Sequence, residues 1–400
     1  MTIETAASGI ETAADLVAAY RPGRSSLFAS PRGTLLAEGT YFAVPPSGRR
    51  DALADLDRRV RAVLGVAEAA GHPVRTVVGA VPFAPDAHAH LVVPTHLRHG
   101  RPAGPGGPGR PVSLERHGIT GLHQVPAADR YAAAVGRAVG QIGDGHYTKV
   151  VLARSLRADS PGFDPAPVVR ALAAREPGGY TFGVDLGAGR TLLGASPELL
   201  VSRRGRQVAA HPLAGSAARG ADPAEDARRA AALLRSEKDR HEHAVVARAV
   251  ADALRPFCAR LTVPPEPSLV RTATMWHLGT LVTGAVADPA TSALTLATAL
   301  HPTPAVCGTP TAAARAAIGE LEPFDRGFYT GMVGWVDATG DGEWAVTIRC
   351  AVADPGGLDL FAGAGIVAGS DPGAELAETS AKLGTMLAAL GLSTEHADVA

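Results

Sequence analysis

Apolar and polar positions divide the chain into short strands and amphipathic helices. Apolar runs separated by glycine-bearing turns are typical of strands joined as hairpins. Such runs occupy residues 148–154, 180–185, 190–195, 199–204, 207–213, 268–278, 328–337, 343–354 and 357–367. Apolar residues at helical spacing predict helices at residues 51–70, 129–142, 222–254, 289–300, 310–320 and 373–391. Clustered helices among hairpin-connected strands predict an α+β enzyme with large antiparallel sheets.

The first third of the chain gives the weakest pattern. Beyond the helix at 51–70 it contains a largely apolar run at 74–83, and residues 98–111 are dense in Gly, Pro and Arg, which predicts an exposed loop. The chain of 400 residues is long enough for one or two domains, and we expect one.

Composition excludes several classes of function. Lys and Arg total 38 against 39 Asp and Glu, a formal net charge of −1, so the chain lacks the basic surface that nucleic-acid binding requires. The three cysteines Cys258, Cys307 and Cys350 are far apart, which excludes a disulfide framework and indicates a reducing compartment. We find no signal peptide and no apolar stretch near the roughly 20 residues of a membrane helix, so we expect a cytoplasmic protein that binds a small molecule.

Two pairs of acidic residues could hold a metal ion. Asp239 and Glu242 lie three apart on one predicted helix face, as do Glu375 and Glu378 on another, with Lys382 four residues further on. Mg²⁺ prefers carboxylate oxygens plus water and leaves room for an anionic ligand. Taken singly, each pair is better explained as an ordinary exposed ion pair or a group of solvated charges.

Lys149 and Glu198 are candidates for proton transfer. Lys149 lies in an otherwise apolar strand, where desolvation or a nearby cation could lower its pKa enough for a base. Glu198 lies between two apolar strands, where burial could raise its pKa towards that of a general acid. The alternative for each is a charge at a strand edge that reaches solvent. His241 and His243 are two apart on a helix and point in different directions, which argues against zinc.

Glycines at 363, 365 and 369 follow an apolar strand, but their spacing differs from that of a dinucleotide-binding loop. The segment precedes one helix and no further strand, so no βαβ unit is present to hold a nucleotide. A nicotinamide dehydrogenase is therefore disfavoured. Close approach of the backbone to a packed helix or a carboxylate explains these glycines better.

Read together, many ordered segments resemble the family of chorismate-utilising enzymes. The resemblance is strong over about residues 129–391 and weak before, although Phe28 to Pro31 is similar to the family's N-terminal strand. The segments are TKVVLAR (148–154), LLGASPELLV (192–201), HPLAGSAARG (211–220), SEKDRHEH (236–243), MWHLGT (275–280), ALHPTPAVCG (299–308), FDRGFYTGMVGW (324–335), GEWAVTIRCA (342–351), GAGIVAGS (363–370) and ELAETSAKL (375–383).

The resemblance implies one domain over residues 1–400, of the fold of anthranilate synthase component I, with a divergent portion at 1–125 and a catalytic core at 126–392. It implies Mg²⁺ held directly by Glu242 and Glu378 and through water by Asp239 and Glu375, with chorismate's ring carboxylate completing the coordination. Lys149 and Glu198 become the base and the acid. The implied substrate-binding positions are Gly215, Ser216, His277, Ala299, Leu300, Tyr329, Arg349, Gly363, Gly365 and Lys382.

Three local features narrow the expected reaction. Lys149 fits a base that activates water, Ala214 stands where aminodeoxychorismate synthases have a nucleophilic lysine, and residues 299–304 resemble the isochorismate-forming subgroup that supplies siderophore pathways. We expect water addition at C2 of chorismate with loss of the C4 hydroxyl. The alternatives are a salicylate-forming enzyme, which would also eliminate pyruvate, and a catalytically silent binding homologue. No partner-binding segment is visible, so we expect a monomer.

Overall fold

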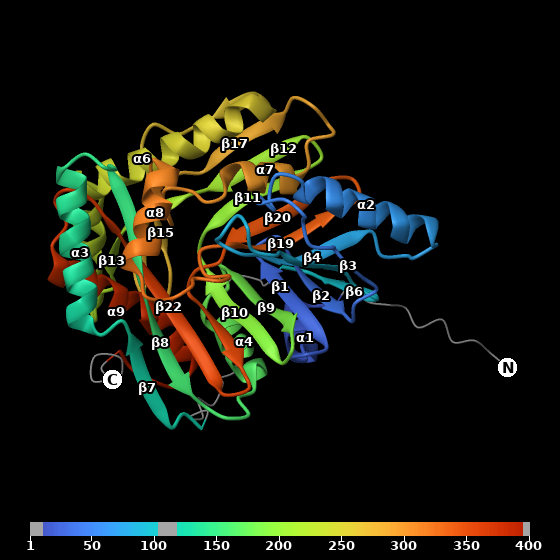
Figure 1. The fold of residues 1–400 in the computed structure, drawn as a ribbon, viewed down its shortest axis with the longest axis horizontal. Helices are drawn as coiled ribbons and strands as arrows, with labels where there is room; N and C mark the ends of the chain where they lie inside the picture. Colours follow the sequence, from blue (N-terminus) through green and yellow to red (C-terminus); the bar gives the residue numbers. More distant parts are fainter. Residues whose placement is uncertain (1–10, 103–117, 395–400) are drawn as a thin grey trace.

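The computed structural model describes residues 11–102 and 118–394, which form two large antiparallel sheets, a small third sheet and flanking helices (Figure 1). Within these residues the first sheet has ten strands. In spatial order they are β18 (Gly308–Thr309), β8 (Lys149–Asp159), β22 (Gly357–Ile366), β21 (Cys350–Asp354), β10 (Arg190–Ser196), β9 (Tyr180–Gly187), β1 (Ser25–Ser30), β2 (Gly33–Glu38) and β6 (His96–Gly100), with β7 (Gly121–Val125) also paired to β8.

The second large sheet has nine strands in the same described ranges. Their order is β14 (Cys258–Thr262), β17 (Val282–Val286), β12 (Gln207–His211), β11 (Leu199–Arg204), β20 (Gly342–Val346), β19 (Met332–Asp337), β4 (Thr76–Val81), β5 (His90–Val93) and β3 (Phe42–Ala43). The small sheet consists of β13 (Leu213–Ala218), β16 (Met275–Gly279) and β15 (Ser268–Arg271). The predicted α+β class with antiparallel sheets is confirmed.

Helices cover the outer faces of the sheets. They are α1 (Ala13–Ala19), α2 (Leu56–Ala69), α3 (Ala128–Gly143), α4 (Pro165–Arg175), α5 (Pro223–Arg235), α6 (Glu237–Leu254), the 3₁₀ turn η1 (Arg255–Phe257), α7 (Ala293–Leu300), α8 (Thr311–Leu321) and α9 (Pro372–Ala389). No helix in the described parts of the chain is long and apolar enough to cross a membrane.

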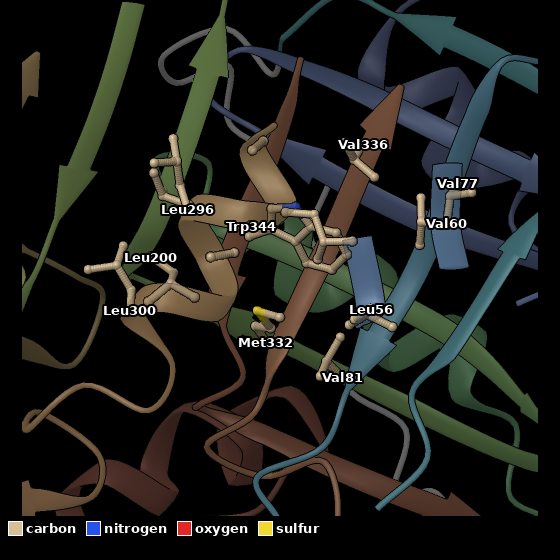
Figure 2. Close-up of a cluster of buried hydrophobic side chains, with 14 of the residues drawn as sticks. Leu56, Val60, Val77, Val81, Leu200, Leu296, Leu300, Met332, Val336 and Trp344 are labelled. Atoms are coloured by element: carbon tan, nitrogen blue, oxygen red, sulfur yellow. The ribbon is translucent and has the colours of Figure 1, made fainter. Parts of the chain in front are cut away.

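Separate apolar clusters join these layers. One lies between the two large sheets and includes Phe182 from the first and Val333 from the second. Another packs α2 and α7 against the second sheet around the buried Trp344 indole, as Figure 2 shows. Burial of this apolar surface is the main favourable contribution to folding.

The N-terminal segments are integral parts of both large sheets. Strand β1 pairs with β9 in the first sheet, and β4 pairs with β19 in the second. Strands from the first third of the chain therefore extend both large sheets, next to β9 in one and next to β19 in the other. This pairing favours a single domain, which stays a prediction. Residues 98–100 of the predicted loop belong to β6, because they pair with β2, and residues 103–111 lie outside the described part.

Several predicted elements are divided in the structure. The single helix predicted at 222–254 is two helices, because Ser236 adopts an extended conformation and its hydroxyl caps α6 by accepting from the Asp239 N–H. The helix predicted at 51–70 begins only at Leu56.

Three predicted strands also divide. Residues 207–213 form β12 and the start of β13, and 268–278 form the hairpin of β15 and β16. Residues 343–354 form β20 and β21, which belong to different sheets. The chain crosses between the sheets at 347–349, where Arg349 has a φ of 51°. This crossing brings Arg349 to the space between the sheets.

Candidate active site

A small cavity of about 60 Å³ lies where the two large sheets, the small sheet, α6 and α9 meet. Most of the predicted site residues line it, namely Glu198, Gly215, Ser216, Glu242, His277, Tyr329, Arg349, Gly363, Gly365, Glu378 and Lys382. Residues separated by almost two hundred positions therefore converge. The cavity is the candidate active site.

Lys149 approaches the cavity from the first residue of β8. Its side chain is only 2% exposed, and its Nζ lies 2.7 Å from Oε1 of Glu242. A strand-edge lysine that reaches solvent, the alternative interpretation, is therefore excluded. Gly365 permits this contact, because a Cβ there would lie 2.4 Å from Oε1 of Glu242. The expected close approach of a carboxylate to this glycine is confirmed.

Glu198 is buried on the connection between β10 and β11. Burial raises the pKa of Glu198 to about 8, although the Leu213 N–H and the charges of Lys149 and Arg349 act in the opposite direction. The carboxyl group is therefore largely protonated at neutral pH and can donate a proton. A solvated strand-edge charge is excluded here too.

Substituting Glu198 with glutamine is expected to make the free energy of unfolding less sensitive to pH between about 4.5 and 8. The pKa of about 8 in the folded state exceeds the ordinary value of 4.5, so the stabilising contribution of the protonated group is complete below about pH 4.5 and is lost as pH rises through about 8. Glutamine stays neutral throughout. The melting temperature of Glu198→Gln relative to the parent should therefore increase between about pH 5 and about pH 9, and parallel curves in differential scanning fluorimetry would contradict this.

The four predicted metal-ligating carboxylates occur on two neighbouring helix faces. Glu242 pairs with Lys149, and Oε1 of Glu378 lies 2.6 Å from Nζ of Lys382 and accepts from Ser216 Oγ at 2.9 Å. Glu375, buried on α9, forms a 3.0 Å ion pair with Lys238 of α6.

These carboxylates influence one another electrostatically. Burial raises the pKa of Asp239, and the charges of Glu242 and Glu378 raise it further. Burial and Glu378 raise the pKa of Glu375 in the same way. Among the described residues, no three His, Cys, Asp or Glu side chains are arranged as a ready metal cluster, and lysine ammonium groups pair with three of the four carboxylates. The donor set nevertheless has the oxygen chemistry that Mg²⁺ prefers.

Groups suited to binding carboxylates surround the other side of the cavity. Arg349 is 8% exposed, and its Nη2 lies 3.4 Å from Nε2 of His277. Burial and the charge of Arg349 lower the pKa of His277 well below its ordinary value, so the imidazole is neutral. Lys382 donates to the Gly363 carbonyl at 2.9 Å, and a Cβ on Gly363 would lie 2.8 Å from the Tyr329 hydroxyl oxygen.

Ala299 and Leu300 do not reach the cavity, which corrects their predicted place among the substrate-binding residues. They end α7, where Ala299 is exposed and Leu300 packs against the second sheet in the cluster of Figure 2. The same segment lines the cavity further on, through Ala305 and Val306. The orientation of α7 explains their placement, because its apolar side covers the second sheet.

Sequence reasoning also missed Val151 and Thr330, which line the cavity. Both lie within segments that carry the family resemblance. Their side chains have no acid, base or charge that would mark them, so only their placement identifies them.

A larger cavity of about 280 Å³ adjoins the site and shares Pro197 and Arg349 with it. Exposed Arg175 and Arg271 lie in its lining, and Glu176 accepts a 3.2 Å hydrogen bond from the Ala273 N–H beside it. The positive groups around Arg349 suit the approach of an anionic ligand.

Comparisons with known proteins give matches over most of the chain. A family model described as chorismate binding enzyme matches residues 111–391. Isochorismate synthase DhbC of Bacillus subtilis is 51% identical over 391 residues, which cover 96% of this chain and 97% of the relative.

Two crystal structures are similar as well. A candidate 2,3-dihydroxybenzoate-specific isochorismate synthase, DhbC, from Bacillus anthracis has a TM-score of 0.88 at 48% identity, over 95% of this chain and 99% of that one. Anthranilate synthase component I from Streptococcus pneumoniae, with a TM-score of 0.69 at 23% identity over 92% and 93% of the two chains, shares the fold.

Proposed function

Because this chain belongs to the chorismate-binding enzyme family, we propose that it is an isochorismate synthase, an isomerase that converts chorismate to isochorismate. The observation that carries the proposal is the pairing of an acid and a base at one cavity. Glu198 has a pKa of about 8, and Lys149 is buried beside Glu242. The name of the B. anthracis relative supports a role for the product in 2,3-dihydroxybenzoate formation and siderophore biosynthesis.

The proposed reaction uses these two groups in opposite senses. Lys149 acts as the neutral amine and removes a proton from the water molecule that attacks C2 of chorismate. The double bonds of the ring shift, and Glu198 gives its proton to the C4 hydroxyl, which leaves as water. The net change moves a hydroxyl group across the ring without any oxidant or reductant.

Binding of the substrate requires neutralisation of its two carboxylates. Arg349, Lys382 and Tyr329 supply charged and hydroxyl groups, and N–H groups near Gly215 and Gly363 add hydrogen bonds. His277, which is neutral, lies beside Arg349 where it can bond to the leaving hydroxyl. Ser216 orients Glu378 by its 2.9 Å hydrogen bond.

The two acidic helix faces are proposed to hold Mg²⁺. Glu242 and Glu378 would bind it directly, and Asp239 and Glu375 would act through metal-bound water. When bound, Mg²⁺ would polarise the conjugated ring carboxylate and favour the shift of the double bonds. Lys149 and Lys382, which now pair with these carboxylates, occupy the positive side of the same site.

We also propose that the protein acts in the cytoplasm as a monomer with chorismate as its small-molecule partner. Free thiols at Cys258, Cys307 and Cys350 are typical of a reducing compartment. The near-balanced net charge of −1 supports a small ligand rather than nucleic acid.

The products formed from chorismate and Mg²⁺ test the proposal. We expect a reversible mixture of chorismate and isochorismate, with little salicylate or pyruvate and no aminated product when ammonium is supplied. Hydration exchanges hydroxyl groups between ring positions of similar energy, so the reaction runs both ways. Chromatography would follow the ring products, and lactate dehydrogenase with NADH would report pyruvate.

Two other outcomes would overturn this function. Salicylate and pyruvate formed at the rate of chorismate loss would identify a salicylate synthase, because elimination of pyruvate drains the mixture irreversibly. A folded protein that binds chorismate but never converts it would identify a silent binding homologue.

A further inference from the structure

Arg326 and Glu322 form a buried ion pair behind the catalytic cavity. Arg326 is 3% exposed and Glu322 is 9% exposed. Nε of Arg326 lies 2.8 Å from Oε2 of Glu322, and Nη2 donates to Oε1. Neither belongs to the described residues that line the cavity, so the reaction proposed above gives them no role.

The other hydrogen bonds of Arg326 all go to residues of the cavity wall. Nη1 donates to the Val306 carbonyl at 2.8 Å and to Thr330 Oγ1 at 3.2 Å, and Nη2 donates to the Val151 carbonyl at 2.7 Å. All three acceptors line the cavity. One rigid guanidinium therefore joins β8, the loop after α7 and the turn before β19.

Glu322 extends this network to the strand of the catalytic base. Its Oε1 accepts from the Ala153 N–H of β8 at 2.7 Å. Ala153 is four residues from Lys149 on the same strand and Val151 is two residues from it, so the ion pair holds β8 at two points near its beginning.

The wall that Arg326 holds includes a strained residue. Thr330 has a φ of 59°, which a β-branched residue rarely adopts. Such a conformation persists only where surrounding contacts impose it. The hydrogen bond from Arg326 supplies one contact. The guanidinium also lies 5.7 Å from the ring centroid of Tyr329, a proposed substrate-binding residue.

We propose that Arg326, oriented by Glu322, is a positioning residue that fixes the cavity wall and thereby keeps isochorismate from losing pyruvate. The inference rests on the proposed function. In the side reaction, the hydrogen atom on C2 of isochorismate is transferred to the methylene carbon of the enolpyruvyl group, where it forms a new C–H bond. The C3–O bond breaks at the same time, which releases pyruvate and leaves salicylate. A wall held in place by Arg326 prevents the enolpyruvyl group from reaching the C2 hydrogen.

The sharpest test is Arg326→Lys. Lysine keeps the positive charge beside Glu322, but its ammonium cannot reproduce the planar fork that reaches three segments. We expect kcat per folded molecule to fall by about 10-fold or more, because a displacement of about 1 Å at an active site can cost up to about 100-fold. The fraction of turnovers that release pyruvate should rise. That fraction does not depend on how much protein is folded, so a loss of stability alone would not change it.

Arg203→Lys is the matched control. Arg203 is 4% exposed and donates to the Thr339 and Pro289 carbonyls at 2.8 Å, away from the cavity. It should keep the parent's kcat per folded molecule and the parent's pyruvate fraction. If Arg326→Lys fails to fold, Glu322→Gln is assessed by the same two readouts, because it retains an oxygen for the Ala153 N–H.

A pyruvate fraction equal to the parent's in the folded variant would overturn the inference. The proposed function is tested separately by the parent enzyme. A parent that makes no isochorismate contradicts the function, whereas an active parent with an unaltered Arg326→Lys product ratio contradicts only the role of Arg326.

Discussion

Chorismate turnover is expected to fall to background in excess EDTA and to return when Mg²⁺ is restored. Besides burial, the charges of Glu242 and Glu378 raise the pKa of Asp239, and the charge of Glu378 raises that of Glu375. A divalent cation would relieve this repulsion. Glu378→Gln should abolish turnover as well, because it removes a proposed direct ligand. Initial rates with and without chelator would measure both effects.

Binding of the ion can be separated from activity. Mg²⁺ that binds only the folded state should raise the melting temperature of the parent but not that of Glu378→Gln. Glu237→Gln, an exposed position in the first turn of α6, is the matched control and should respond as the parent does. Full activity after exhaustive removal of divalent cations would refute the metal assignment.

Separate removal of the base and the acid should each lower kcat by roughly 10²-fold or more. Lys149→Ala removes the group that activates water, and Glu198→Gln removes the proton that the leaving hydroxyl needs. Both variants should still bind chorismate, because Arg349 and Lys382 remain. In the parent, kcat should fall as pH rises above about 8, since Glu198 then loses its proton. Steady-state rates and equilibrium binding would measure these effects.

A second buried glutamate provides the control for the acid. Glu343 is 3% exposed, burial raises its pKa too, and Ser30 donates to it at 2.8 Å, but it lies outside the cavity lining. Glu343→Gln should keep a rate close to the parent's. A near-normal rate in Lys149→Ala or Glu198→Gln would remove that residue from the proposed mechanism.

The local pattern of apolar and polar residues predicted strands and helices best where an apolar segment forms a single element without a change of direction. Residues 199–204 were predicted as a strand and form β11 with the same bounds. The predicted helix at 222–254 and strand at 343–354 failed where the chain changes direction inside an apolar pattern. Ser236, three residues before Asp239, was a visible capping signal for the first break. The second depends on the positive φ of Arg349, for which the sequence has no signal.

The charged candidates were identifiable because their residue types and spacing limit the chemistry. Two carboxylates three residues apart share a helix face in any fold, which is why Glu242 and Glu378 could be selected. The family resemblance then assigned partners from distant segments. In the structure Glu198, Glu242 and Glu378 line one cavity, and Lys149 lies against Glu242.

Contacts between distant segments decide which side chains face the cavity, and the short-range sequence pattern does not specify this. Ala299 and Leu300 belong to a segment that resembles the isochorismate-forming subgroup. They point away from the cavity because α7 buries its apolar face against the second sheet. Arg326 lies in a segment that carries the family resemblance, but the sequence assigned it no role. It became a candidate only because its guanidinium donates to three carbonyl or hydroxyl oxygens of the cavity wall. Residue type and spacing determine which chemistry a side chain can perform, whereas packing and hydrogen bonding between distant segments determine where it performs that chemistry.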